Sequence, residues 1–137
     1  MDLTPTLKLR KKLAKVSPGK YFSSYDEVKD TYDVVLVPEV MEHVPNVQSF
    51  IKDVLSISSN EYFFSVPNAS VAQIFCDDTY ALEIVHPDHK YWFSPYTLYN
   101  VMKPFLEGYE IQMCYLENKS QIGIRLWKEK INDNVVE

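Results

Sequence analysis

Two short apolar runs and one amphipathic stretch dominate the pattern of hydrophobic and polar positions along the chain. Residues 33–37 and 62–66 are almost continuously apolar, as in strands that are buried on both faces of a parallel sheet. Between them, apolar residues of segment 47–55 recur at the i, i+3, i+4, i+7 and i+8 spacing. This spacing predicts a helix, which Pro45 and Asn46 open.

Weaker signals predict the remaining elements. Thr4-Pro5 and Ser94-Pro95 each place a hydroxyl cap before a proline, which favours a helix start. The pattern therefore predicts these further elements: a helix from Thr4-Pro5 to residue 16, a short strand over 20–23, a short helix after residue 37 that ends at Pro45, a helix from Ser94 that Pro104 ends or kinks and Gly108 closes, and a hairpin of strands 109–116 and 121–127. Alternating strands and helices favour an α/β fold with a mostly parallel sheet and a C-terminal antiparallel hairpin.

The chain of 137 residues suits one domain over residues 1–137, and its 46% hydrophobic content is typical of a globular protein. Its net charge of −5 is unevenly distributed, because residues 1–20 carry +5 and the remainder carries −10. An acidic body repels phosphates, so we expect no nucleic-acid partner. The basic stretch is either an anion-binding patch or the solvated face of a helix.

Cysteine use and hydropathy indicate a cytoplasmic protein. Cys76 and Cys114 are far apart in the sequence and form no CxxC pair, which favours free thiols in a reducing compartment. No apolar run reaches the length that a bilayer requires, and no apolar stretch of a secretory signal follows the basic N-terminus.

Four segments together resemble class I S-adenosylmethionine-dependent methyltransferases. Residues 32–44, which run from Tyr32-Asp33-Val34-Val35 to Glu39-Val40-Met41-Glu42-His43, resemble the fourth strand of that family and its exit. Segments 2–6, 65–68 and 86–98 resemble the end of the second strand, the end of the fifth strand and a later loop with its helix. The last segment is frequent in a branch associated with polysaccharide biosynthesis, so the resemblance implies a sugar or small-metabolite acceptor.

The resemblance assigns a set of cofactor contacts. It implies that Asp2 accepts hydrogen bonds from the ribose hydroxyls of S-adenosylmethionine, and that Asp26 lies near the adenine. It places Val37, Pro38 and Glu39 beside the methionine part, with His43 one turn further on. The alternative for Glu39, Glu42 and His43 is that these polar groups only stabilise the turn.

The same comparison gives candidates for catalysis and acceptor binding. His89 and His86 are the candidate bases, while Asn68, Tyr91, Trp92 and Phe93 are the candidate acceptor contacts. Both histidines could instead be loop residues packed on aromatic rings. Their HxxH spacing could also hold a metal ion with Asp88 or Glu42, but without a cysteine cluster or HExxH motif we expect no metal site.

One departure from the family bears on function. The sequence contains no glycine-rich cofactor loop, since Gly19, Gly108 and Gly123 stand alone. In the family the strand before that loop lies beside the fourth strand, so we expect segment 33–37 to have an open edge that a second copy, a complementary N-terminal half or a rearranged N-terminal segment covers. Two functions remain open: a methyltransferase, or a non-catalytic remnant that serves as an interaction module.

Overall fold

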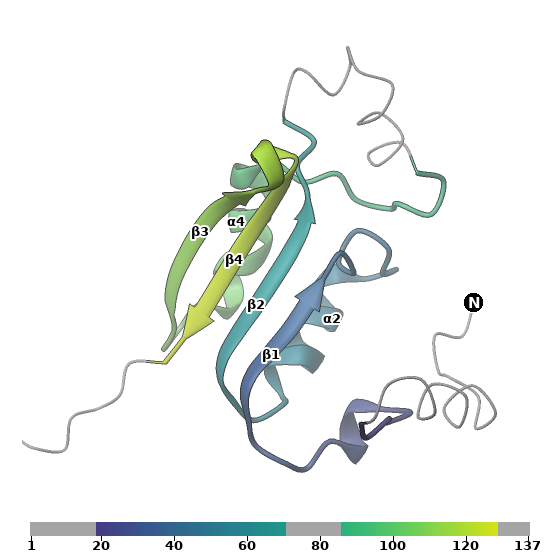
Figure 1. The fold of residues 1–137 in the computed structure, drawn as a ribbon, viewed down its shortest axis with the longest axis vertical. Coiled ribbons are helices and arrows are strands. Elements are labelled where there is room, and N and C mark those ends of the chain that lie inside the picture. Colours follow the sequence, from purple (N-terminus) through teal and green to yellow (C-terminus); the bar gives the residue numbers. More distant parts are fainter. Residues whose placement is uncertain (1–18, 71–85, 129–137) are drawn as a thin grey trace, which may run out of the picture.

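The computed structural model describes residues 19–70 and 86–128 (Figure 1). The predicted helix from Thr4-Pro5 and the contact assigned to Asp2 lie outside these residues. The elements are, in chain order, β1 (Tyr32–Pro38), α2 (Val47–Leu55), β2 (Ser59–Pro67), α4 (Pro95–Met102), β3 (Glu110–Leu116) and β4 (Gln121–Trp127), with the 3₁₀ helices η1 (Tyr25–Glu27), η3 (Lys103–Phe105) and η4 (Glu117–Lys119) between them.

The four strands form one mixed sheet in the order β1-β2-β4-β3. β1 runs parallel to β2, whereas β4 runs antiparallel to both β2 and β3. The α/β class and the C-terminal hairpin are confirmed, but the prediction of a mostly parallel sheet is wrong. Only one of the three pairings is parallel, because β4 turns back from β3 and inserts next to β2.

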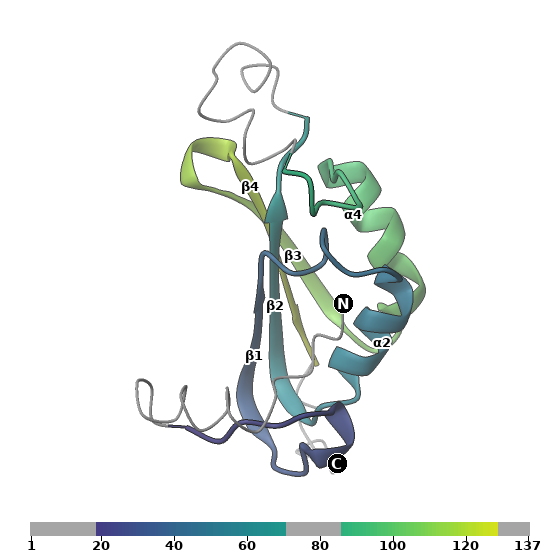
Figure 2. The ribbon, with the colours of Figure 1, turned by 90° about the vertical axis from the view of Figure 1, so that its right-hand side faces the viewer.

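The described α-helices, α2 and α4, cover the same face of the sheet, as Figure 2 shows. Asn46 caps α2 by accepting a hydrogen bond from the Ser49 backbone N–H at 2.9 Å, and Ser94 and Thr97 form a capping box at the start of α4. The core between helices and sheet consists of buried apolar side chains, among them Val37, Ile51, Val54, Tyr62, Phe64, Leu98, Met102, Ile122, Ile124 and Leu126.

Two local predictions differ from the structure. Segment 20–23 forms no strand; among the described residues it finds no neighbouring strand, and a strand needs one to satisfy its backbone. The predicted short helix before Pro45 is a turn over residues 41–43, because proline disfavours helical backbone in the residue before it. The prediction that Pro104 ends or kinks the last helix is confirmed, since α4 ends at Met102 and continues only as η3, where Pro104 lacks a helical donor.

None of the helices in the described part of the chain is long and apolar enough to cross a bilayer.

Candidate functional site

The candidate site begins where β1 and β2 end side by side, since parallel strands present their carboxyl ends at one edge of the sheet. Glu39 follows β1 directly and has left-handed backbone with φ 51°. Its N–H donates to the Ser65 carbonyl at 3.0 Å, and the Ser65 hydroxyl donates to its Oε1 at 3.1 Å. A non-glycine residue in this conformation is uncommon, and such strain concentrates at functional sites.

Glu42 lies in the turn that follows and is the most unusual side chain of the site. It is only 1% exposed, and neither of its carboxylate oxygens has a hydrogen-bond partner within the described residues. Burial raises the pKa of its carboxyl above the ordinary value. The imidazole of His43 lies beside it, with Nε2 3.6 Å from Oε1 of Glu42. A buried carboxylate without donors is costly unless a cation or a proton compensates it.

The segment before α4 is held against this turn by four hydrogen bonds, one of them from the Tyr91 backbone N–H to the Glu42 carbonyl at 3.3 Å. The Lys90 backbone N–H donates to the Glu42 carbonyl at 2.6 Å, and its Nζ donates to the His43 carbonyl, also at 2.6 Å. The Tyr91 hydroxyl donates to the Pro45 carbonyl at 3.0 Å. These bonds hold His89, the residue before Lys90, against the turn although 46 positions separate it from His43.

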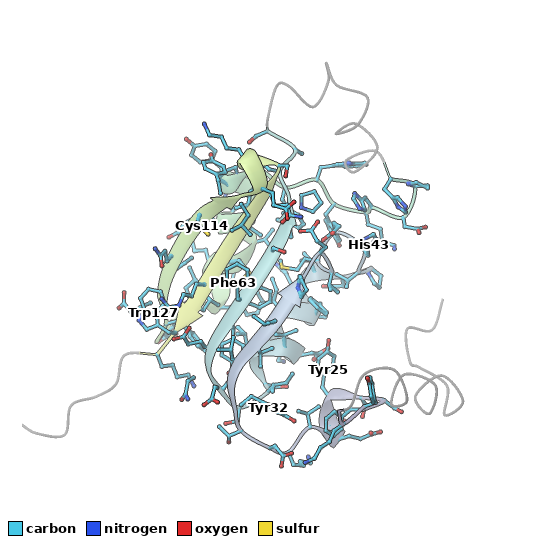
Figure 3. The ribbon with its side chains drawn as sticks, viewed as in Figure 1. Tyr25, Tyr32, His43, Phe63, Cys114 and Trp127 are labelled. Carbon is cyan, nitrogen blue, oxygen red and sulfur yellow. The ribbon has the colours of Figure 1, made fainter. Side chains whose placement is uncertain are left out.

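The result is a cluster of one carboxylate and two imidazoles, which we call the Glu42–His43–His89 cluster. One potential ligand atom from each of the three residues lies within 4.8 Å of the others. The rings of His43 and His89 meet edge to face with centroids 4.7 Å apart, and His86 lies 5.4 Å from His89. Figure 3 shows His43 beyond the carboxyl end of β1, at this edge of the sheet.

A cavity of about 310 Å³ opens onto the cluster, lined by Glu39, Glu42, His43, Pro67, His86, His89 and Gln121. Imidazole and carboxylate ligands together suit divalent transition metals such as Zn²⁺, Mn²⁺ and Fe²⁺. The unpartnered carboxylate of Glu42 fits such an ion, because the ion would supply the missing positive charge. The cluster and its cavity therefore have the composition of a metal site with room for a further ligand.

A second, larger cavity of about 780 Å³ runs along α2, and its lining includes Ser24, Tyr25, Val40, Val44 and Phe50. The two cavities lie on either side of the turn that carries Glu42. Asp26 is exposed and does not line the larger cavity, although its neighbours Ser24 and Tyr25 do. The adenine contact predicted for Asp26 stays a prediction.

The structure brings His43, His86, His89 and Glu39 to one cavity, while the roles that the resemblance assigned to them stay predictions. The sequence indicated Glu42 as a group that stabilises the turn or as an alternative metal partner, but not as the centre of the cluster. A signal was present, since an apolar run followed by Glu-x-x-Glu-His places two carboxylates and an imidazole at a strand exit. The burial that makes Glu42 unusual is a tertiary property that this pattern does not contain.

The other predicted residues lie around this cavity or in the core. Val37 is part of the core, and Pro38 is exposed at the end of β1. Asn68 is 1% exposed; its Nδ2 donates to the Lys119 carbonyl at 2.9 Å, and its Oδ1 accepts bonds from Ser70. Phe93 is buried and stacks on Tyr91 with centroids 6.0 Å apart, while Trp92 is 57% exposed. Their assigned contacts with cofactor or acceptor stay predictions.

No protein-family model matches the sequence, and no curated protein matches it either. Among solved structures, the chain is similar to a possible histamine N-methyltransferase from Thermotoga maritima, an S-adenosylmethionine-dependent enzyme, with 13% identity and a TM-score of 0.62, covering 91% of this chain and 71% of the other. It is similar to the methyltransferase domain of bacterial CtHen1, with 13% identity and a TM-score of 0.61, covering 90% and 74%.

A third similar structure is a chain of the Pnkp1/Rnl/Hen1 RNA repair complex, with 14% identity and a TM-score of 0.63. The match covers 88% of this chain but only 28% of that one. Two of these three structures are methyltransferases by description, so this chain has the fold of the S-adenosylmethionine-dependent methyltransferases. At these identities the likeness shows the fold alone.

Proposed function

We propose that the chain is the metal-binding, acceptor-side part of an S-adenosylmethionine-dependent methyltransferase that acts on a hydroxyl of a sugar-type acceptor. The observation that carries this proposal is Glu42, a buried carboxylate that lies against His43 and His89 and has no hydrogen-bond partner in residues 19–70 and 86–128. The methyltransferase fold supports the reaction class, and the cavity beside the cluster supplies space for the acceptor.

Each residue of the cavity has a distinct role in the proposal. Glu42, His43 and His89 would hold a divalent cation, which when bound would lower the pKa of an acceptor hydroxyl. Glu39, oriented by the Ser65 hydroxyl, accepts a hydrogen bond from the acceptor. His86, at the exposed side of the same cavity, takes up the proton that the hydroxyl releases.

The chain offers a cavity for one part of S-adenosylmethionine but no segment suited to its methionine end. The larger cavity has the volume and the mixed apolar and hydroxyl lining of a small-molecule site, and Tyr25 offers an aromatic wall for an adenine ring. The sequence supplies no glycine-rich loop for the methionine end. No step of the reaction is therefore assigned to the cofactor, and a metal-binding module without methyl transfer is the second candidate function.

Titration of the metal-free chain with Mn²⁺, followed by calorimetry and by electron paramagnetic resonance, tests the metal site. The wild type should bind one ion, while Glu42→Gln and His89→Gln should each weaken binding by about tenfold or more. The matched control is Glu110→Gln, which changes an exposed carboxylate on β3 and should leave the affinity unchanged. Equal affinities in all four proteins would overturn the metal assignment.

A second titration, with S-adenosylmethionine and S-adenosylhomocysteine, separates the two candidate functions. Binding of the cofactor followed by methyl transfer to a sugar with adjacent hydroxyls would support the methyltransferase. Ribose carries the same pair of hydroxyls, and one similar structure belongs to an RNA repair complex, so a short oligoribonucleotide is the comparison acceptor. Metal binding without cofactor binding would favour the non-catalytic module.

A further inference from the structure

Gln121 lines the cavity beside the cluster but has no part in the metal site. It is the first residue of β4, and its register partner Pro67 at the end of β2 lines the same cavity. The cluster follows β1, so it and Gln121 lie on the two sides of the end of β2, which separates β1 from β4 in the sheet. Two strand spacings amount to about 10 Å, which leaves room for a small ring between them.

The carboxamide of Gln121 supplies a kind of hydrogen bond that the carboxylates of the cavity do not. When ionised, Glu39 and Glu42 only accept hydrogen bonds, so they suit the hydroxyl groups of a ligand. A ring oxygen or an ether oxygen also only accepts, and it therefore needs a donor from the protein. Pro67 has no side-chain donor, and in the proposed function the imidazoles serve the metal and the released proton. Gln121 offers two N–H donors without a charge.

The turn before Gln121 has an unusual backbone. η4 joins β3 to β4, and Glu117 and Lys119 at its two ends are left-handed, with φ 42° and 72°. Residues other than glycine persist in this conformation only where surrounding contacts hold them. One such contact is the Ser120 hydroxyl, which donates to the Glu117 carbonyl at 2.8 Å.

Asn68 fixes this turn against the end of β2. Its Nδ2 donates to the Lys119 carbonyl at 2.9 Å, and its backbone N–H donates to the Ser120 carbonyl at 2.8 Å. Its Oδ1 accepts hydrogen bonds from the N–H and the hydroxyl of Ser70. Asn68 is 1% exposed and both ends of its carboxamide are engaged, which leaves it little capacity to bind a molecule in the cavity. Figure 1 shows the turn between β3 and β4 beside the carboxyl end of β2.

We propose that Gln121 donates a hydrogen bond to the ring oxygen of a sugar acceptor, and that Asn68 positions Gln121 through the η4 turn. This contact rests on the proposed function, in which the reacting hydroxyl of the acceptor lies at the cluster. The sugar ring then spans the end of β2, with its oxygen toward Gln121 and its hydroxyls toward Glu39 and the cluster. The contact selects sugars over cyclitols, because a cyclitol has carbon in place of the ring oxygen and leaves the Gln121 donor unpaired.

Two matched probes test the contact in the full chain: methyl β-glucopyranoside and its carba-analogue, in which a methylene group replaces the ring oxygen. Saturation-transfer NMR measures their affinity for the metal-free chain, and relaxation of the probe protons by bound Mn²⁺ measures it for the loaded chain. The wild type should bind the glucoside about threefold to tenfold more tightly than the carba-analogue, which is the effect of one hydrogen bond. Gln121→Leu should bind both probes equally.

A conservative variant and a matched control accompany Gln121→Leu. Gln121→Glu keeps the length of the side chain but replaces the N–H donors with an acceptor, so it should also lose the preference for the glucoside. Gln112 is exposed on β3 and does not line the cavity, so Gln112→Leu should keep the preference of the wild type. Equal affinities of the two probes for the wild type, or an unchanged preference in Gln121→Leu, would overturn the contact.

The positioning role of Asn68 has its own measurement. Asn68→Ala removes the bond to the Lys119 carbonyl and should abolish most of the preference for the glucoside. Adding Lys119→Gly should restore part of the preference, since glycine adopts the left-handed backbone of this position without strain. A purely structural role of Asn68 predicts no such rescue, and an unchanged preference in Asn68→Ala would overturn the positioning role.

Failure of this contact is distinct from failure of the proposed function. The Gln121 variants should bind Mn²⁺ with the affinity of the wild type, because no residue of the cluster is changed. Mn²⁺ binding without any preference between the probes would leave the metal site in place and overturn the contact. A preference for the glucoside in a chain that binds no Mn²⁺ would support the contact and overturn the metal assignment.

Discussion

Glu42 buries a carboxylate that no hydrogen-bond donor among the described residues compensates. The carboxylate is 1% exposed, and the groups that face it are the imidazoles of His43 and His89. Because burial raises the pKa of Glu42, the folded state retains its proton to a higher pH than the unfolded state does. Its favourable contribution to stability is therefore present below the ordinary carboxyl pKa and is lost as the pH rises through the raised pKa.

We predict that Glu42→Gln stabilises the metal-free protein at neutral pH by about 1–3 kcal/mol, because the amide needs no buried charge. Urea unfolding in the presence of a chelator at several pH values measures this. The stability of the wild type should fall with rising pH more steeply than that of Glu42→Gln, and saturating Mn²⁺ should reverse the order of stability. Parallel pH profiles of the two proteins would contradict the prediction.

Lys90 acts on the cluster through backbone carbonyls. Replacing it with methionine removes the charged hydrogen bond to the His43 carbonyl, which is worth about 1.5 kcal/mol or somewhat more. If this bond positions the cluster, Lys90→Met should weaken Mn²⁺ binding about tenfold, and Lys90→Arg should restore part of the loss. Lys29→Met, at an exposed position, is the control. Unchanged affinity in Lys90→Met would mean that the remaining hydrogen bonds suffice.

At the scale of elements, the caps determine where the helices begin. In α4 the Ser94 hydroxyl accepts a hydrogen bond from the Thr97 N–H at 3.2 Å, and Oγ1 of Thr97 accepts one from the Ser94 N–H at 2.8 Å. Ser94→Ala should therefore lower the free energy of unfolding by about 1 kcal/mol. Denaturant unfolding checks this, with Ser94→Asp, which restores an N-cap acceptor, as the control that should recover most of the loss.

Elements with local signals were the ones that the sequence predicted well. β1, β2 and α2 follow from apolar runs and a cap, and the predicted bounds of β4 are those of the structure. The strand predicted over segment 20–23 was wrong, because a strand depends on a neighbouring strand that the local sequence pattern does not reveal. The site was predicted in part: its histidines were found from the sequence, but the hydrogen bonds from Lys90 and Tyr91 that bring His89 to the turn are contacts between distant segments.

At the scale of the whole molecule, the side of the sheet opposite α2 and α4 carries no covering layer among the described residues (Figure 2). Leu36 of β1 is 67% exposed in the described structure. Leu36→Ser should therefore change the free energy of unfolding by no more than about 0.5 kcal/mol, and so should the control Tyr96→Ser, because Tyr96 is 82% exposed. A loss of about 1–2 kcal/mol in Leu36→Ser alone, measured by denaturant unfolding, would contradict the exposure of this side chain.

The strand order also has a consequence for synthesis on the ribosome. β4 is the last of the described strands to be translated, yet it is an inner strand that pairs with both β2 and β3. Until Trp127 has left the exit tunnel, β2 has only β1 beside it among the described strands, and the apolar side chains that β4 contributes to the core are missing. The nascent chain therefore completes this sheet only after β4 has emerged, and premature stop codons before β4 should yield chains that are cleared by proteases.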